Sequence, residues 1–298
     1  MRLGIVRAIG CVLGLTAALL FVVPGGVAGA ASPPGPGYRL AAADGGVFTF
    51  GNAPFLGTRC MFECFGFAAT SDGQGYWILD SYPYPSSTPS TSSLHGFGSV
   101  SDVTGLPEGG SAATSDASGK GGWVLYGQSG QVVPFGDAQW YGDGSNIDIL
   151  GTLLTIPPYG TLSYFQGIVG SADGKGYWLV GEDGGVFSYG DARFYGSMGG
   201  KHLNAPVAGI ARTNGGDGYW LVAYDGGVFS FGDANFSGSM AGRPLNDIMI
   251  SIAANPDGSG YWTAAIDGGV FSFGDAPFLG SMGGRRLNQP VRSIVGTG

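Results

Sequence analysis

The chain of 298 residues contains 60 glycines and 17 prolines, about twice the usual share of roughly 12% for these two residue types. Hydrophobic residues make up 44% of the sequence and charged residues only 11%, which excludes a disordered chain, and no collagen triplet occurs. The formal net charge of −8 provides no clustered basic surface for nucleic-acid binding. The composition therefore predicts a folded, turn-rich protein that does not bind nucleic acid.

The first 30 residues have the organisation of an export signal. Arg2 and Arg7 precede an uncharged apolar run at 9–23, which is too short for a secure membrane span. Small residues follow at 27–30, where a signal peptidase cleaves. We expect cleavage at Ala30 or a neighbouring residue, a short linker at 31–36, and a secreted protein, free or associated with the cell wall. An uncleaved N-terminal anchor is the alternative.

A repeat occupies the rest of the chain. The pentapeptide Asp-Gly-Gly-Val-Phe occurs four times, and its last two intervals are both 42 residues. The copies begin at Asp44, Asp183, Asp225 and Asp267. The unit at 207–240 predicts short strands separated by turn residues, with Asp-Gly as a tight hairpin. These strands span 207–211, 219–224, 228–231 and 236–239. Two degenerate copies around Trp77 and Trp123 bring the total to six units, none with helical periodicity.

Six four-stranded antiparallel units predict an all-β domain at 37–298, a six-bladed β-propeller whose sheets pack face to face around a channel. One large side chain in each unit is expected to fill the space between sheets. This position holds Trp77, Trp123, Trp178, Trp220 and Trp262, with Arg39 as the single departure. The domain opens on a second strand at 37–40 and closes on a first strand at 290–295. We therefore expect the two ends to complete one blade.

Two cysteines follow the export signal, Cys60 and Cys64, and they predict a disulfide in an oxidising compartment. The loop that they close is small, so the chain-entropy model gives only about 2 kcal/mol, which indicates local stiffening. A lone cysteine pair is poor support for a metal site. We expect neither a metal nor a cofactor.

Two insertions interrupt the repeat, and strand parity places both at the end of the units where the second-to-third hairpins lie. One covers 81–89 and the other 145–164. Their tyrosines and prolines suit stacking on sugar rings or extended peptides, with a tolerated, disordered loop as the alternative. Three equivalent loops add positively charged residues to the same end. These residues form either a basic arc that binds an acidic glycan or a solvated surface without a ligand. The candidate ligand-binding residues are Tyr82, Tyr84, Tyr159, Tyr164, Lys201, His202, Arg243, Arg285 and Arg286.

The units read GYWLV, then DGGVFSFGDA, then GSMGG, and in this they resemble the secreted propeller-type repeats of actinobacterial proteins. The resemblance covers 37–298, is strongest at 176–298 and is eroded at 75–144. It implies export and a propeller fold, often beside cell-wall hydrolases or peptidases, and it assigns no chemistry to particular residues. Kelch and WD40 repeats are similar only in architecture.

Catalytic motifs are scarce in this sequence. It has no Gly-x-Ser-x-Gly and only two histidines, of which His95 stands at a strand position typical of a packed residue. The acidic residues Glu108, Asp143, Asp148 and Glu182 follow no recognisable spacing. We therefore assign no catalytic residue and predict an exported binding module for cell-wall polysaccharide or an extracellular protein. The alternatives are a structural scaffold without a specific ligand and a carbohydrate-active enzyme that uses channel carboxylates.

Overall fold

The structure is a computed structural model and describes residues 35–61, 63–81, 91–147, 155–156, 160–161 and 165–297. These residues all belong to the unit Pro34–Gly298. The expected export signal at 1–30 lies outside the described residues. What the structure describes consists of strands, turns and irregular segments, and it includes no helix capable of spanning a bilayer.

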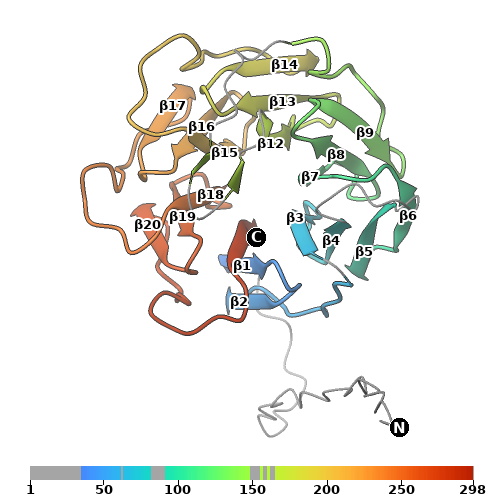
Figure 1. Ribbon diagram of the computed structural model, residues 1–298, viewed down its shortest axis with the longest axis horizontal. Helices are drawn as coiled ribbons and strands as arrows, with labels where there is room; N and C mark the ends of the chain where they lie inside the picture. The colour runs from blue at the N-terminus through green and yellow to red at the C-terminus, as the bar shows by residue number, and fades with distance from the viewer. Residues whose placement is uncertain are drawn as a thin grey trace, which may run out of the picture. The chain divides into compact units, whose positions relative to one another are not determined.

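Antiparallel strands in the described residues form six sheets of three or four strands and one two-stranded ribbon (Figure 1). The sheets are β2–β1–β21 (Val47–Gly51, Gly37–Ala42, Val291–Thr297), β3–β4–β5–β6 (Glu63–Ala69, Gly75–Ser81, Ser92–Gly98, Val103–Leu106), β7–β8–β9 (Ala112–Ser115, Gly122–Tyr126, Gln131–Phe135), β12–β13–β14 (Phe165–Gly170, Gly176–Gly181, Val186–Gly190), β15–β16–β17 (Val207–Arg212, Gly218–Ala223, Val228–Gly232) and β18–β19–β20 (Met249–Ala254, Gly260–Ala265, Val270–Gly274). The ribbon pairs β10 (Thr155–Ile156) with β11 (Gly160–Thr161).

One strand of each sheet lies nearest a common centre in Figure 1, and we call these the inner strands. They are β3, β7, β12, β15, β18 and β21. Each inner strand contacts the inner strand of the next sheet, and β21 contacts both β18 and β3. A separate hydrophobic cluster occupies each space between neighbouring sheets. Burial of apolar side chains between the sheets therefore holds them together.

The first and last strands belong to the same sheet. Strand β1 pairs with β2 on one side and with β21 on the other, where Leu40 stands opposite Ile294. This pairing agrees with the prediction that the two ends of the domain complete one unit. Because β1 has partners on both sides, it leaves no open edge.

Four of the buried tryptophans pack on a tyrosine of the next sheet, whereas Trp77 packs on Phe135, because the next sheet has Gly122 at the tyrosine position. The ring centroids of Trp220 and Tyr261 are 5.3 Å apart, and the indole Nε1 of Trp220 donates to the carbonyl of Asn235 at 2.8 Å. The other indoles donate equivalently, from Trp77 to Ser101, Trp123 to Gln139, Trp178 to Arg193 and Trp262 to Pro277. Each indole thus fills the space between two sheets while its single polar group keeps a partner.

Arg39 occupies the equivalent position and makes the same two kinds of contact. Its side chain is fully buried, with the guanidinium carbon 4.9 Å from the centroid of the Tyr76 ring. Its Nε donates to the carbonyl of Pro54 at 3.0 Å, as an indole would, and its Nη2 donates to Gly73 at 3.0 Å. The departure from tryptophan therefore keeps both the donor and the contact with the next tyrosine.

The predicted fourth strand forms in only one of the described sheets, as β6. In the unit at 207–240, the segment 236–239 has no ladder partner. Its backbone bonds to a side chain instead, because the hydroxyl of Tyr261 donates to Gly238 at 2.6 Å and accepts from the Ser237 N–H at 3.2 Å. The prediction of four strands in every unit is wrong in this respect, because a tyrosine hydroxyl takes up the bonds that a strand would make.

The Asp-Gly-Gly motif closes the hairpin between the second and third strands. Gly226 has a φ of +80°, and a Cβ there would lie 2.6 Å from the Cβ of Met240. The Asp225 carboxylate accepts from the Gly227 N–H at 2.9 Å. Equivalent bonds are made by Asp44, Asp183 and Asp267. Both the φ and the close approach require glycine, which explains why the motif recurs.

We expect Arg39→Ala to lower the free energy of unfolding by about 2 to 4 kcal/mol, because it empties a buried space and removes two hydrogen bonds. Arg39→Trp should keep most of the stability, since an indole supplies the donor used at the five equivalent positions. Urea unfolding followed by circular dichroism measures both, with the exposed Arg243→Ala as the control. Equal stability of Arg39→Ala and this control would contradict the assignment.

Candidate functional site

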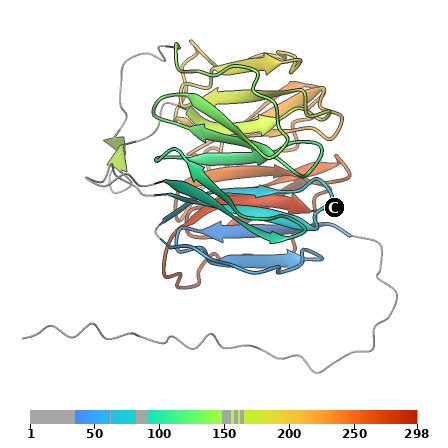
Figure 2. The same ribbon diagram turned by 90° about the vertical axis from the view of Figure 1, so that its right-hand side faces the viewer.

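A cavity of about 570 Å³ runs between the six inner strands, each of which contributes to its lining. Figure 2 shows the strands crossing the unit from one end to the other, so that the turns gather at two opposite ends. The antiparallel register places Glu63, where β3 begins, beside Ser81, where β4 ends. We call the end that holds the starts of the inner strands and the second-to-third hairpins the hairpin end.

An ion pair links two neighbouring sheets at the hairpin end of the cavity. Nη2 of Arg292, on β21, lies 2.5 Å from Oε1 of Glu63, and about a third of each side chain is exposed. The guanidinium carbon of Arg292 lies 5.6 Å from the centroid of the Phe65 ring. Its Nε is buried and has no hydrogen-bond partner among the described residues. The ion pair therefore holds the guanidinium of Arg292 in place, and the Nε–H of this residue remains available as a donor.

Three polar side chains from other sheets lie near this ion pair: the carboxyl group of Glu182, the phenol of Tyr224 and the amide of Gln166. Burial, together with the charge of Asp183, raises the pKa of Glu182 to about 7. Burial, together with the charge of Glu182 and against that of Arg292, raises the pKa of Tyr224 to about 12. The Tyr224 hydroxyl lies 3.3 Å from Oε1 of Gln166, to which it donates. We call the following residues the rim cluster: Glu63, Gln166, Glu182, Tyr224 and Arg292.

The rim cluster can hold a polar ligand and move a proton. Oε2 of Glu182 is buried without a hydrogen-bond partner in the described part of the chain. A carboxyl group with a pKa near 7 accepts or releases a proton close to neutral pH. Among the described residues, Cys60, Cys64 and Asp80 form the one group whose side chains come together as metal ligands would.

A chain of polar side chains begins with buried residues on β4 and β5 and ends with the exposed residues Arg59 and Asp102. Oδ2 of Asp80 lies 3.1 Å from Nε2 of His95, and both side chains are almost fully buried. Nδ1 of His95 lies 2.7 Å from Nη2 of Arg59, which itself lies 2.5 Å from Asp102. Because arginine can only donate, Nδ1 accepts and the ring proton on Nε2 is donated to Asp80. His95 is buried, as predicted, and both of its nitrogens have partners.

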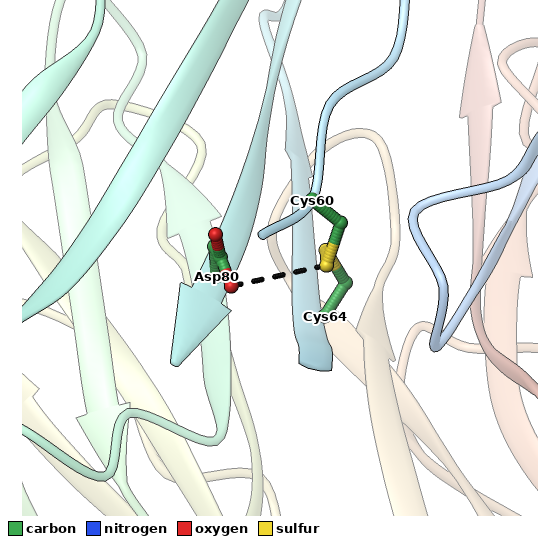
Figure 3. A group of neighbouring side chains, drawn as sticks. All are labelled: Cys60, Cys64 and Asp80. Carbon is green, nitrogen blue, oxygen red and sulfur yellow. Dashed lines mark hydrogen bonds between the residues drawn. A yellow bond between two sulfur atoms is a disulfide. The ribbon is translucent and has the colours of Figure 1, made fainter. Parts of the chain in front are cut away.

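The predicted disulfide between Cys60 and Cys64 is present. Cys64 lies in β3 and is buried, whereas Cys60 lies in the loop that follows β2 and is half-buried. Figure 3 shows the bond beside Asp80 of the neighbouring strand β4. The disulfide therefore joins a surface loop to an inner strand at the hairpin end.

The structure places part of the predicted ligand-binding set. Tyr82, Tyr84, Tyr159 and Tyr164 lie outside the described residues, as does Asp148. The side chains of Lys201, His202, Arg243, Arg285 and Arg286 are exposed. Three of them occupy equivalent turns, in which the N–H of Lys201, Arg243 or Arg285 donates at 2.9 Å to Met198, Met240 or Met282. Within the described ranges, the side chains of these five residues make no hydrogen bond or ion pair.

Sequence reasoning missed most of the rim cluster and a set of exposed aromatic residues. Of the rim residues, only Glu182 was among the candidates. The sequence signal that could have identified them is a charged or polar residue near the start of an apolar inner strand, such as Gln166 or Arg292.

The exposed aromatic residues follow the Gly-Asp-Ala turn or its equivalent, and more than half of each side chain is exposed. They are Phe55, Trp140, Phe194, Phe236 and Phe278.

No protein-family model matches the chain, and no curated protein matches it. Solved structures do match the chain in their fold. A chain from the crystal structure of a nidogen/laminin complex is 10% identical, with a TM-score of 0.56, and the match covers 88% of this chain and 98% of that one. A candidate 6-phosphogluconolactonase from Bacteroides fragilis is 13% identical, with a TM-score of 0.51, covering 91% and 100%. Another from Bacteroides uniformis is 13% identical, with a TM-score of 0.50, covering 84% and 82%. At these identities the likeness shows the fold alone, which is β-propeller-like.

We expect Glu182→Gln to remove one component of the pH dependence of stability. The folded chain keeps a proton on Glu182 up to a pKa of about 7, whereas the unfolded chain loses it near 4.5. The free energy of unfolding therefore falls as the pH rises between these values and then levels off. Relative to the unsubstituted chain, Glu182→Gln should gain stability from pH 5 to pH 8. Urea unfolding at both pH values tests this, with Glu108→Gln as the control. A difference that is independent of pH would refute it.

Proposed function

We propose that the unit Pro34–Gly298 is a closed six-bladed β-propeller, exported from the cell, that binds cell-wall glycan at its hairpin end. The circular succession of inner strands and the six hydrophobic clusters between sheets support six blades. The sequence at 1–30 and the disulfide support export. The resemblance to secreted actinobacterial repeats supports the same compartment.

The observation that carries the binding proposal is a set of buried polar atoms at the rim of the cavity. Oε2 of Glu182, Nε of Arg292 and Oγ of Ser293 have no hydrogen-bond partner within the described part of the chain. Buried polar groups normally have partners, and each one left without costs about 1 to 3 kcal/mol. Adjacent sugar hydroxyls both donate and accept, so a glycan could satisfy all three atoms.

Loops on the same end extend this surface. We include the tyrosines of the insertions at 81–89 and 145–164 in the proposed binding face, because β4 ends and β12 begins at the hairpin end, where these insertions join them. The cationic loops at 201–202, 243 and 285–286 lead from one sheet to the next and give an acidic glycan a second region of contact.

An enzyme is the second candidate, and the pKa of Glu182 is what favours it. A carboxyl group that titrates near 7 is suited to act as a general acid or base on a sugar. The rim cluster also holds a second carboxylate, Glu63, which is engaged in the ion pair with Arg292. Release of reducing ends from a bound polysaccharide would identify this activity.

We expect the purified full chain to be retained on fractionated cell-wall polysaccharide. The double variant Glu182→Leu, Arg292→Met should reduce retention at least about tenfold, because it removes two hydrogen-bonding groups of the site. Lys175→Ala, in the turn before β13 at the opposite end, is the control. Equal retention of all three chains would show that the binding site lies outside the rim cluster. Retention only on cell-surface protein would assign a protein ligand, and no retention would favour a scaffold.

The cationic loops predict a second, electrostatic contribution. Raising the salt concentration from 50 to 500 mM should weaken retention on an acidic polysaccharide, since exposed charges are screened. The variant Arg285→Gln, Arg286→Gln should bind more weakly at low salt and respond less to added salt, while binding to a neutral polysaccharide stays the same. Binding curves at the two concentrations measure this. An unchanged salt response in the variant would exclude these arginines.

A further inference from the structure

The disulfide and one buried carboxylate form a compact group at the hairpin end. The sulfur atoms of Cys60 and Cys64 and a carboxylate oxygen of Asp80 all lie within 4.8 Å of one another (Figure 3). In the register of β3 and β4, Cys64 stands directly opposite Asp80. Cys60 approaches from the loop after β2. Three chain segments thus bring two sulfurs and a carboxylate to one point.

The Asp80 carboxylate is held in a fixed direction. Its Oδ2 accepts from the Met61 N–H at 2.8 Å and from Nε2 of His95 at 3.1 Å. Its Oδ1 faces the sulfur of Cys60 at 3.8 Å, the contact drawn as a dashed line in Figure 3. A disulfide sulfur has no proton to donate, so this contact is not a hydrogen bond while the disulfide is intact. A thiol at Cys60 could donate to Oδ1, and a bound cation could be shared with it.

We propose that reduction of the Cys60–Cys64 disulfide converts this group into a zinc site, with the two thiolates and the Asp80 carboxylate as ligands. A cellular dithiol gives two electrons and two protons to the disulfide, yields two thiols and becomes a disulfide itself. Binding of Zn²⁺ then displaces both thiol protons to solvent. The protein therefore carries either the disulfide or the metal, and the redox state of its surroundings selects between them.

The chemistry of the donors favours zinc over the hard cations. Thiolates together with a carboxylate suit Zn²⁺, whereas Ca²⁺ and Mg²⁺ require oxygen ligands. The separation of Cys60 and Cys64 by three residues lies within the range usual for zinc ligands. His95 bonds to the carboxylate and so orients it, as residues around metal ligands commonly do. Three protein ligands leave a fourth tetrahedral position for water.

Access to the bond is uneven, which suits reversible reduction. Cys60 is half-buried and stands between the exposed residues Arg59 and Met61, whereas Cys64 is 2% exposed. An incoming thiolate therefore attacks the sulfur of Cys60 and releases that of Cys64. The first thiolate formed is then the buried one, beside the carboxylate that would share the metal.

Cobalt titration of the full chain tests the proposal. Every protein carries Cys11→Ser, so that only two thiols remain, and reduction uses a phosphine, which takes an oxygen from water and becomes the phosphine oxide. We expect the reduced chain to bind one Co²⁺ with a thiolate-to-metal absorption band, Zn²⁺ to abolish the band, and the oxidised chain to show none. Absence of the band from the reduced chain would overturn the proposal.

Variants separate the ligands from the fold. Cys64→Ser should lose the band, and Asp80→Asn should weaken Co²⁺ binding at least tenfold, while Asp267→Asn, in an equivalent hairpin without cysteines, should match the parent chain. Binding unaffected by Asp80→Asn would remove the carboxylate from the site. If either variant fails to fold, Zn²⁺ should still protect Cys60 and Cys64 of the reduced chain from alkylation, as measured by mass spectrometry. Equal alkylation with and without Zn²⁺ would overturn the site independently.

Discussion

The contact on which the arrangement depends is the packing of one indole on the tyrosine of the next sheet. Trp220 bonds to the outer segment of its own unit through Asn235, and Tyr261 bonds to the same segment through Gly238. One segment without a ladder is therefore held by side chains from two sheets. Aromatic residues with one polar group are suited to this, because they fill the space between sheets and still satisfy a buried backbone group. Arg39, which replaces the indole in one unit, keeps this geometry, whereas Trp77 packs on Phe135 because the sheet next to it lacks the tyrosine.

How far the sequence predicts this structure depends on how local each signal is. Hairpins such as Asp225 to Gly227 were predictable, because adjacent glycines in the sequence indicate the backbone conformation that the turn requires. The three strands of each unit followed from alternation and turn residues. The segment 236–239 has a strand-like composition as well, yet the Tyr261 hydroxyl occupies its backbone groups. Composition does not reveal which partner a backbone group will find.

The candidate site was less predictable, for a related reason. The disulfide and the exposed cations come from short motifs that can be read directly. The rim cluster draws Gln166, Tyr224 and Arg292 from three different units, and only the succession of sheets brings them around one cavity. The raised pKa of Glu182 arises mainly from burial, which a sequence does not display. Likewise, nothing near His95 in the sequence indicates Arg59 as its partner.

The pairing of β1 with β21 also sets an order of events during synthesis. Tyr38 stands opposite Gly296, so strands from the two ends of the domain must meet before their sheet is complete. Contacts between residues so far apart in sequence form slowly, because the intervening chain must be ordered first. While a ribosome is still making the last unit, β1 presents an open edge that could pair with another chain. Five sheets can form from residues close in sequence, whereas the sixth can be completed only after Val291–Thr297 has been made.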